Sequence, residues 1–211
     1  MYRDIQRRKV FLGCVSNLDS LGIMISQYYS AQDLKDLGIK RVGKNVHISK
    51  DSVITGIENI EIGNNVRIDS YNVILAARGW LKIGSNVHIE PLSSLIAHNG
   101  IIIGDFCTVS HGVRLFTASA NYSGEYFTNV FPDQRFQKPV AGPIEIQSHV
   151  IVGANSVVMP NVLLSEGAAI GAMSFVRKSL EGWQVYGGNP LKLISERSKS
   201  IRDLGIQLLE S

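Results

Sequence analysis

A six-residue repeat of aliphatic residues runs through most of this sequence. Between 150 and 176 an aliphatic side chain returns at every sixth position, as Val152, Val158, Leu164, Ile170 and Val176. Six residues is the period of neither an α-helix nor a β-strand. A backbone that turns a corner every six residues would direct each of these side chains to an equivalent inward site. Because one such unit cannot bury its apolar side alone, the repeat indicates a solenoid whose neighbouring coils form the core.

The same repeat occurs earlier in groups of three, at Val42, Ile48 and Ile54, then Ile62, Ile68 and Ile74, then Ile83, Ile89 and Leu95, then Ile103, Val109 and Leu115. The next group always begins eight or nine residues after the previous one ends. Three short strands per coil predict a triangular column, and the extra residues should stack into one ridge along it. Glycines and asparagines after the aliphatic residues, such as Gly63 and Asn65, are expected at the bends because both tolerate left-handed backbone conformations.

Segments without the repeat flank and interrupt the column. The predicted domains are an N-terminal extension and capping helix at 1–41, a β-helix domain at 42–180 with a loop excursion at 116–145, and a C-terminal turn and helix at 181–211. Five aromatic residues between Tyr122 and Phe136 in the loop excursion argue against disorder, so we expect it to pack, on a neighbouring subunit. Apolar residues at helical spacing predict an amphipathic helix over 191–210, which Ser198 or Ser200 would divide into two pieces.

The capping helix has clear boundary signals. Ser30 is a suitable N-cap, Asp33 stands where a capping box places its acidic residue, and Gly38 is a suitable stop. We expect this helix to cover the first coil, which would otherwise expose its core and unpaired strand edges. Because Met24 shortly precedes the helix and residues 1–23 lack the repeat, we also hypothesise that Met24 is the physiological start.

Composition narrows the possible partners. The chain has 21 Lys and Arg against 18 Asp and Glu, and its aromatic residues do not alternate with basic ones, which argues against nucleic acid. No stretch approaches the roughly 20 apolar residues that cross a bilayer, so we expect no membrane insertion and a cytoplasmic location. Cys14 and Cys107 lie far apart without a Cys-His cluster, which predicts neither a disulfide framework nor a metal site. Cys107 is expected in the core.

The tandem hexads at 146–176, the loop after Leu115 and the ending VYGGNPLK at 185–192 together resemble the hexapeptide-repeat acyltransferases. The resemblance covers about 42–194. It implies a left-handed parallel β-helix, although parallel crossovers are generally right-handed. It also implies a homotrimer with active sites between subunits and an acyl-coenzyme A donor.

In that family the donor usually lies along the column between two subunits, near the C-terminal coils. The resemblance therefore implies a donor-binding set of Gly153, Ala154, Gly171, Ala172, Gly187, Gly188 and Asn189. Small residues allow the close backbone approach that a pantetheine arm needs. Lys178, Lys192 and Arg197 are candidates for the coenzyme phosphates, the alternative being ordinary solvated surface.

The segment 103–119 resembles the stretch that leads to the catalytic histidine of galactoside and maltose O-acetyltransferases. Ala120 stands at the matching place, and the sugar-contacting carboxylate of that branch falls on Ala97. The run 121–126 instead resembles the branch that N-acylates nucleotide-linked amino sugars, particularly dTDP sugars. A neutral amine is itself nucleophilic, so that chemistry needs a strong base less than a hydroxyl does.

Three residues are catalytic candidates under that resemblance. Glu125 would hold or deprotonate the amino group, and His98 on the ridge would orient the sugar or relay a proton. His111 is the third, its alternative being a corner histidine hydrogen-bonded to backbone. The remaining histidines are expected to be structural, namely His47, His88 and His149.

The acceptor candidates come from two places. Asn121 and Tyr122 belong to the run that resembles the amino-sugar branch. Tyr71, Arg78 and Trp80 are expected on the ridge, where they would stack on a base or pair with a diphosphate. Trp80 has the alternative role of filling a subunit interface.

Three functions therefore remain open. The first is an acyl-CoA-dependent N-acyltransferase acting on a dTDP-linked amino-deoxy sugar for surface polysaccharide such as O-antigen. The second is a sugar O-acetyltransferase whose base is His98 or His111. The third is a non-catalytic β-helix that binds a ligand or assembles a complex. The aromatic loop and the coenzyme-like C-terminal coils disfavour the third.

Overall fold

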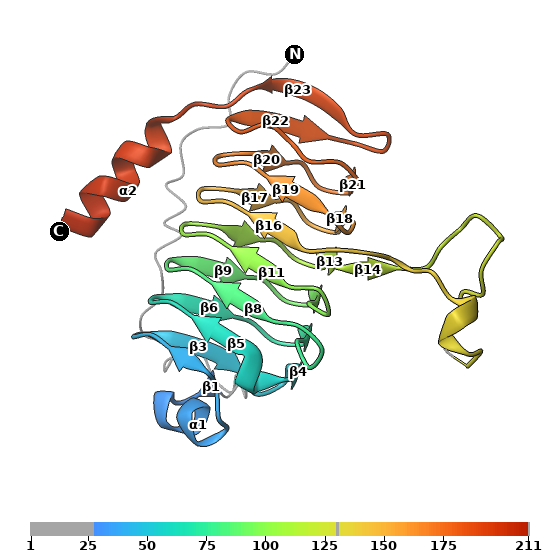
Figure 1. The fold of residues 1–211 in the computed structure, drawn as a ribbon. Helices are drawn as coiled ribbons and strands as arrows, with labels where there is room; N and C mark the ends of the chain where they lie inside the picture. Colours follow the sequence, from blue (N-terminus) through green and yellow to red (C-terminus); the bar gives the residue numbers. More distant parts are fainter. Residues whose placement is uncertain (1–27, 130, 211) are drawn as a thin grey trace, which may run out of the picture.

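The computed structural model describes residues 28–129 and 131–210. The chain winds into a column of stacked coils whose three sides are parallel β-sheets (Figure 1). We name the sides A, B and C, and each coil passes through them in the order A, C, B. Residues 1–27, which include Cys14, the leading segment 1–23 and the hypothetical start at Met24, lie outside the described residues.

The strands are two to five residues long. Side A contains β1 (Tyr28–Tyr29), β3 (Val46–Ser49), β6 (Val66–Ile68), β9 (Val87–Ile89), β12 (Thr108–Val109), β17 (Ile151–Val152), β20 (Ala169–Ile170), β22 (Gln184–Gly187) and β23 (Lys192–Glu196). Side B contains β2 (Arg41–Val42), β5 (Ile60–Ile62), β8 (Leu81–Ile83), β11 (Ile101–Ile103), β16 (Ile144–Ile146) and β19 (Val162–Leu164). Side C contains β4 (Val53–Thr55), β7 (Val73–Leu75), β10 (Ser94–Ile96), β13 (Arg114–Phe116), β18 (Val157–Val158) and β21 (Phe175–Val176).

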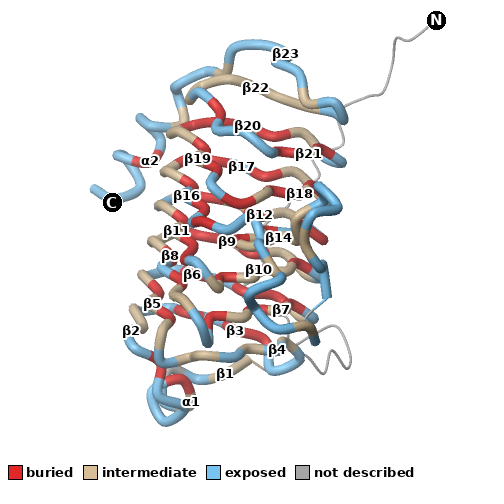
Figure 2. The backbone as a smooth tube through the Cα atoms, turned by 45° about the vertical axis from the view of Figure 1, so that its right-hand side comes forward, coloured by how far each residue is buried: buried red, intermediate tan, exposed pale blue. Residues whose placement is uncertain are grey.

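The repeat positions form the core. From Ile62 to Val176 every aliphatic repeat residue is at most 2% exposed, and Figure 2 shows buried residues recurring along the inside of each coil. Burying one such side chain stabilises the fold by about 1.5–3 kcal/mol. Only Val42 and Ile54, in the first coil, are partly exposed. Cys107 is buried as predicted, and burial raises the pKa of its thiol to about 12.

The capping helix α1 (Ala31–Asp36) is confirmed. The Ser30 side chain accepts the Asp33 N–H at 3.0 Å, and the Asp33 carboxylate accepts the Ser30 N–H at 2.8 Å. Gly38 follows with a φ of 83°. Leu34 of α1 is fully buried in the core, so the helix closes the first coil (Figure 1).

The two kinds of bend residue have different roles. Asn45, Asn65 and Asn86 adopt φ values of 54–58°, as predicted, and their side-chain amides form a ladder with 3.0 Å hydrogen bonds. The glycines predicted for the same reason do not have positive φ. A Cβ on Gly63 would lie 2.7 Å from the carbonyl carbon of Gly84 in the next coil. These glycines are needed for close stacking of the coils.

The loop excursion leaves the column as an arm. Strands β14 (Ala118–Ser119) and β15 (Val140–Ala141) pair antiparallel and carry residues 120–129 and 131–139 away from the three sides (Figure 1). A short 3-10 helix, Gln134–Phe136, lies on the arm, and another, Ile57–Asn59, lies between β4 and β5.

The C-terminal segment corrects one prediction. Residues Lys192–Glu196 form β23, which pairs antiparallel with β22, and helix α2 spans only Ser200–Glu210. The last rung of side A would otherwise present an unpaired strand edge, so strand pairing prevails over the helical pattern. Helix α2 then lies along the column (Figure 1), with Gly205 against Phe106 and His149. Neither helix in the described residues is long and apolar enough to cross a membrane.

Replacing Gly63 with alanine tests the stacking role. We expect Gly63→Ala to lower the free energy of unfolding by about 1–3 kcal/mol, because its methyl group meets backbone that cannot move aside. Gly171→Ala is the matched control, since its Cβ would lie 3.4 Å from the nearest atom. Denaturant unfolding of both variants at equal protein concentration measures the difference. Equal stability would contradict the stacking role.

Candidate active site at the two edges of side C

The small donor-binding residues predicted from the sequence lie together along the edge between sides A and C, whereas Lys178 follows β21 of side C and Lys192 lies on β23. This A–C edge comprises residues 69–72, 90–93, 110–113, 153–156, 171–174 and 187–190. The N–H of Gly153 donates to the Ile170 carbonyl at 2.8 Å, and that of Gly171 donates to the Tyr186 carbonyl at 2.7 Å. Ser110, Gly153, Gly171 and Gly187 therefore occupy successive rungs of one column.

The small residues of the A–C edge differ in how much space they leave for a ligand. A Cβ on Gly153 would lie 2.5 Å from the backbone nitrogen of Ala172, so Gly153 serves coil stacking. Gly171 has ordinary space around it, and Ala172 and Gly188 are exposed. Gly188 also has a φ of 93°. The upper part of this edge thus offers an open, flat strip of backbone that fits a narrow chain with amide groups.

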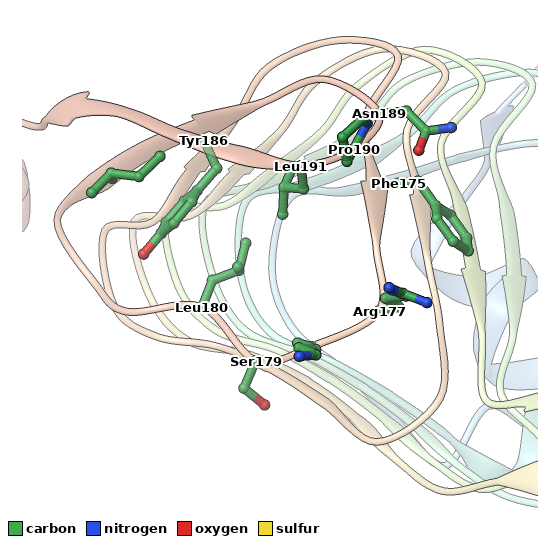
Figure 3. A pocket seen from close by; sticks show the side chains of 10 residues that line it. Phe175, Arg177, Ser179, Leu180, Tyr186, Asn189, Pro190 and Leu191 are labelled. Carbon is green, nitrogen blue, oxygen red and sulfur yellow. The ribbon is translucent and has the colours of Figure 1, made fainter.

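A cleft of about 580 Å³ opens at the C-terminal end of the column. Figure 3 shows its side chains around the open last coil, and it is lined by Phe175, Arg177, Lys178, Ser179, Leu180, Tyr186, Asn189, Pro190, Leu191 and Leu193. Two predicted donor residues, Lys178 and Asn189, meet there. Arg177 and Tyr186 were not predicted. The combination of two cations with aromatic rings fits a phosphorylated ligand that carries a base.

Two further cations predicted for phosphate are not in this cleft. Arg197 donates through Nη1 to the carbonyls of His149 at 2.7 Å and Gly167 at 2.9 Å. Burial lowers the pKa of its guanidinium, and Nη1 is committed to backbone, which favours a structural role for Arg197 over the predicted phosphate contact. Lys192 is exposed on β23, outside the residues that line the cleft.

His111 lies on the A–C edge, below the small residues. Its backbone N–H donates to Oε2 of Glu90 at 3.1 Å, and its carbonyl accepts the N–H of Asn155 at 2.8 Å. The residue is exposed, and these bonds involve its backbone rather than its ring. Of the three predicted catalytic residues, His111 is therefore the one on the same edge as the predicted donor residues.

His98 lies on the opposite edge of side C, between sides C and B. This C–B edge is the predicted ridge, residues 55–59, 76–80 and 97–100, and the arm leaves it one coil later. Arg78 is exposed there, and the Trp80 ring packs against Gly100 with Lys82 Nζ 5.5 Å from its centre. The prediction that Tyr71 shares this ridge is wrong. Residue 71 precedes its side C strand, so it lies on the A–C edge, 63% exposed.

Glu125 lies on the arm with Asn121 and Tyr122. It helps line a hollow of about 240 Å³ whose walls include Tyr126, Phe127, Arg135 and Phe136. Its Oε2 accepts a hydrogen bond from Ser123 Oγ at 3.3 Å. The side chain of Tyr122 is 85% exposed. Within one protomer the whole width of side C separates this group from His111.

One outward column of side C is apolar, whereas the other outward column includes Ser94 and the exposed Arg114. Leu75, Ile96, Phe116 and Met159 stack in register along the apolar column, each partly buried. The corresponding outward positions of side B include Glu61, Lys82 and Glu145. The two edges with candidate residues therefore border the side that carries this apolar column.

Known proteins identify the family. No protein-family model matches the chain. It is 41% identical over 177 residues to the dTDP-4-amino-4,6-dideoxy-D-glucose acyltransferase of Escherichia coli. The aligned region covers 84% of this chain and 92% of the relative. The chain belongs to this acyltransferase family.

Solved structures agree with that assignment. AntD, an N-acyltransferase from Bacillus cereus solved with dTDP and 3-hydroxybutyryl-CoA, superimposes with a TM-score of 0.84 at 36% identity, over 88% of this chain and 98% of AntD. A galactoside acetyltransferase solved with coenzyme A superimposes with a TM-score of 0.50 at 20% identity, over 81% of this chain and 71% of the acetyltransferase chain. This structure shares the fold. The predicted left-handed parallel β-helix and the predicted acyltransferase class are thus confirmed.

The acyltransferase carries polar groups on the lower A–C edge that sequence reasoning did not assign. Asp69 is 8% exposed and accepts Arg67 Nε at 2.6 Å, His88 Nε2 at 2.7 Å and Tyr28 OH at 3.3 Å. Burial would raise the pKa of Asp69, but the hydrogen bonds from His88 and Arg67 outweigh it and lower the pKa. His88, expected to be structural, orients this carboxylate. In residues 28–129 and 131–210 no three His, Cys, Asp or Glu side chains group to hold a metal.

Glu90 is the second unassigned group on this edge. The register Ile68 to Ile89 to Val109 places Asp69, Glu90 and Ser110 in one outward column below Gly153. The hexad spacing alone contained this signal, since each of these residues directly follows an aliphatic repeat position.

Enlarging Ala172 tests the upper edge as the donor strip. We expect Ala172→Leu to raise the KM for acyl-CoA roughly tenfold, a cost of about 1.4 kcal/mol, because the larger side chain lifts a bound chain off the backbone. Ala77→Leu, at another exposed alanine, on the C–B edge, should leave that KM unchanged. Steady-state kinetics with acyl-CoA varied compares the two. An unchanged KM in Ala172→Leu would exclude this strip.

Proposed function

We propose that this acyltransferase transfers an acyl group from acyl-CoA to the amino group of dTDP-4-amino-4,6-dideoxyglucose or a close relative, for surface polysaccharide such as O-antigen. The observation that carries the proposal is the 41% identity to an enzyme named for that acceptor, over 84% of this chain. AntD, which was solved with dTDP and an acyl-CoA, supports it. Both substrates are cytoplasmic metabolites, so we propose the cytoplasm as its location.

The donor would lie along the A–C edge. In this arrangement Lys178 and Arg177 meet the phosphates at the C-terminal cleft, and the pantetheine arm descends past Ala172. Three rungs separate Gly187 from Ser110, and at about 4.8 Å per rung they span roughly 14 Å, which an extended pantetheine arm can cover. The thioester would then reach the level of Ser110 and His111.

A homotrimer would complete the site. Leu75, Ile96 and Phe116 form an apolar strip that a protomer alone leaves partly exposed, and packing three copies through side C would bury it. The A–C edge of one protomer would then meet the C–B edge and arm of the next. This brings His98 and Glu125 of one subunit to the donor edge of another, and gives the exposed aromatic residues of the arm a partner.

The chemistry needs little from the protein. The amine nitrogen attacks the thioester carbonyl carbon, the C–S bond breaks, and the proton lost from nitrogen ends on the departing thiolate. The amine must be unprotonated when it attacks, and the site must stabilise the oxyanion, for which backbone N–H groups suffice. His111 would accept or relay the proton, and His98 would orient the sugar.

An acceptor panel tests the activity. With acetyl-CoA and 3-hydroxybutyryl-CoA as donors, we expect free thiol with dTDP-4-amino-4,6-dideoxyglucose and none with the sugar nucleotide that carries a hydroxyl at that position. Thiol release with the hydroxy sugar would favour an O-acetyltransferase. No release with any acceptor, together with no coenzyme A binding by calorimetry, would favour a non-catalytic binding protein.

A charge on side C tests the trimer. We expect Ile96→Glu to convert the assembly to monomers and abolish activity, because the glutamate would be buried between subunits without a partner. Ile102→Glu is the matched control, an outward isoleucine on side B next to Lys82 and Glu145. Sedimentation velocity gives the mass of each. A trimeric Ile96→Glu protein would exclude side C as the interface.

A further inference from the structure

We propose that Glu90 binds the amino group of the acceptor and makes the enzyme prefer an amine to a hydroxyl. The inference rests on the proposed function and names a residue of the same site. It assigns to the A–C edge the acidic role that the sequence suggested for Glu125 on the arm.

Glu90 stands where donor and acceptor would meet. Its column continues upward through Ser110 and Gly153 to the strip proposed for the pantetheine arm. Its Oε2 accepts the His111 backbone N–H at 3.1 Å, so the carboxylate is held at the edge rather than free in solvent. The residue is only partly exposed. One oxygen is therefore committed to the fold, while the carboxylate keeps acceptor capacity for a ligand.

The charge of Glu90 is not balanced. The neighbouring acid in the column, Asp69, is paired with Arg67 at 2.6 Å and His88 at 2.7 Å. Among the described residues no Lys, Arg or His forms an ion pair with Glu90. A partly buried carboxylate without a cation favours a positively charged partner. An amino sugar that arrives as an ammonium ion supplies one, and it must pass a proton to Glu90 or His111 before the neutral amine attacks, whereas a hydroxy sugar supplies none.

Glu125 fits this role less well. It is exposed, its carboxylate accepts Ser123 Oγ at 3.3 Å, and it lines a hollow on the arm that also contains Arg135. An exposed carboxylate near a guanidinium discriminates weakly between charged and neutral ligands, because water and the arginine both screen it. Glu90, on the donor edge itself, needs no movement of the arm to reach the thioester level.

The test compares Glu90→Gln with Glu145→Gln. Glu145 is an exposed, outward glutamate on β16 of side B, so its variant should behave as wild type. In Glu90→Gln we expect the KM for dTDP-4-amino-4,6-dideoxyglucose to rise 10- to 100-fold, the loss of one charge-assisted hydrogen bond. The KM for acyl-CoA should stay within twofold, which a general loss of structure would not allow.

The selectivity readout is the decisive one. The hydroxy sugar nucleotide serves as a competitive inhibitor, and its inhibition constant is divided by the KM for the amino sugar. We expect this ratio to be high in wild type and Glu145→Gln and to fall at least tenfold in Glu90→Gln. A ratio that persists in Glu90→Gln overturns the inference, and a fall in Glu125→Gln instead assigns the role to the arm.

Two further outcomes distinguish a failure of the Glu90 inference from a folding defect and from a failure of the proposed function. If Glu90→Gln does not fold, Glu90→Asp keeps the charge and withdraws it by one methylene, so the KM for the amine must rise while the inhibition constant of the hydroxy analogue stays constant. An unchanged KM in that variant overturns the inference. If wild type does not acylate the amino sugar at all, the proposed function fails, independently of Glu90.

Discussion

The backbone hydrogen bonds between successive coils determine everything else in this molecule. From β2 to β22 the strands of the coils pair in parallel and in register with the equivalent strands of the next coil, about 20 residues away except across the arm. Inward aliphatic residues therefore stack on one another, and outward residues form straight columns. A functional surface on such a fold is a column of side chains at a chosen edge. Neighbours in the site are one coil apart in sequence, which explains why Asp69, Glu90 and Ser110 belong together.

Much of the fold follows from local rules that a sequence displays openly. The hexads specify the core, the asparagines specify one set of bends, and Ser30 with Asp33 specifies the cap, because each depends on residues close in sequence or on a strict period. The strand β23 could not be predicted, since its helical pattern is overridden by an unpaired edge that exists only after the column has formed. Tyr71 was misplaced because the repeat shows that corners exist but not which side follows each one.

The separate segments of the candidate site could be predicted from the sequence, but their relation in space could not. Glycine and alanine at the right phase identified the A–C edge, and the aromatic loop identified the arm. Nothing local to either segment shows that side C lies between them or that one of its outward columns is apolar. A lone glutamate such as Glu90 carries no motif. Its proposed role depends on its lack of a cationic partner, in contrast to Asp69, 21 residues away, and this contrast is visible only when the side-chain pairs are known.

The first coil of the column is closed by a helix, whereas the last coil is only partly covered, and this difference bears on function. At the first coil Leu34 fills the core and α1 closes it. At the last coil β23 protects the strand edge of side A, while Arg197 ties the segment before α2 to the backbone of two coils. Tyr186 and Leu191 stay half exposed around the cleft. A full cap there would bury more apolar surface but would also occupy the space proposed for the coenzyme. An incompletely covered last coil is therefore what a donor site at this end requires.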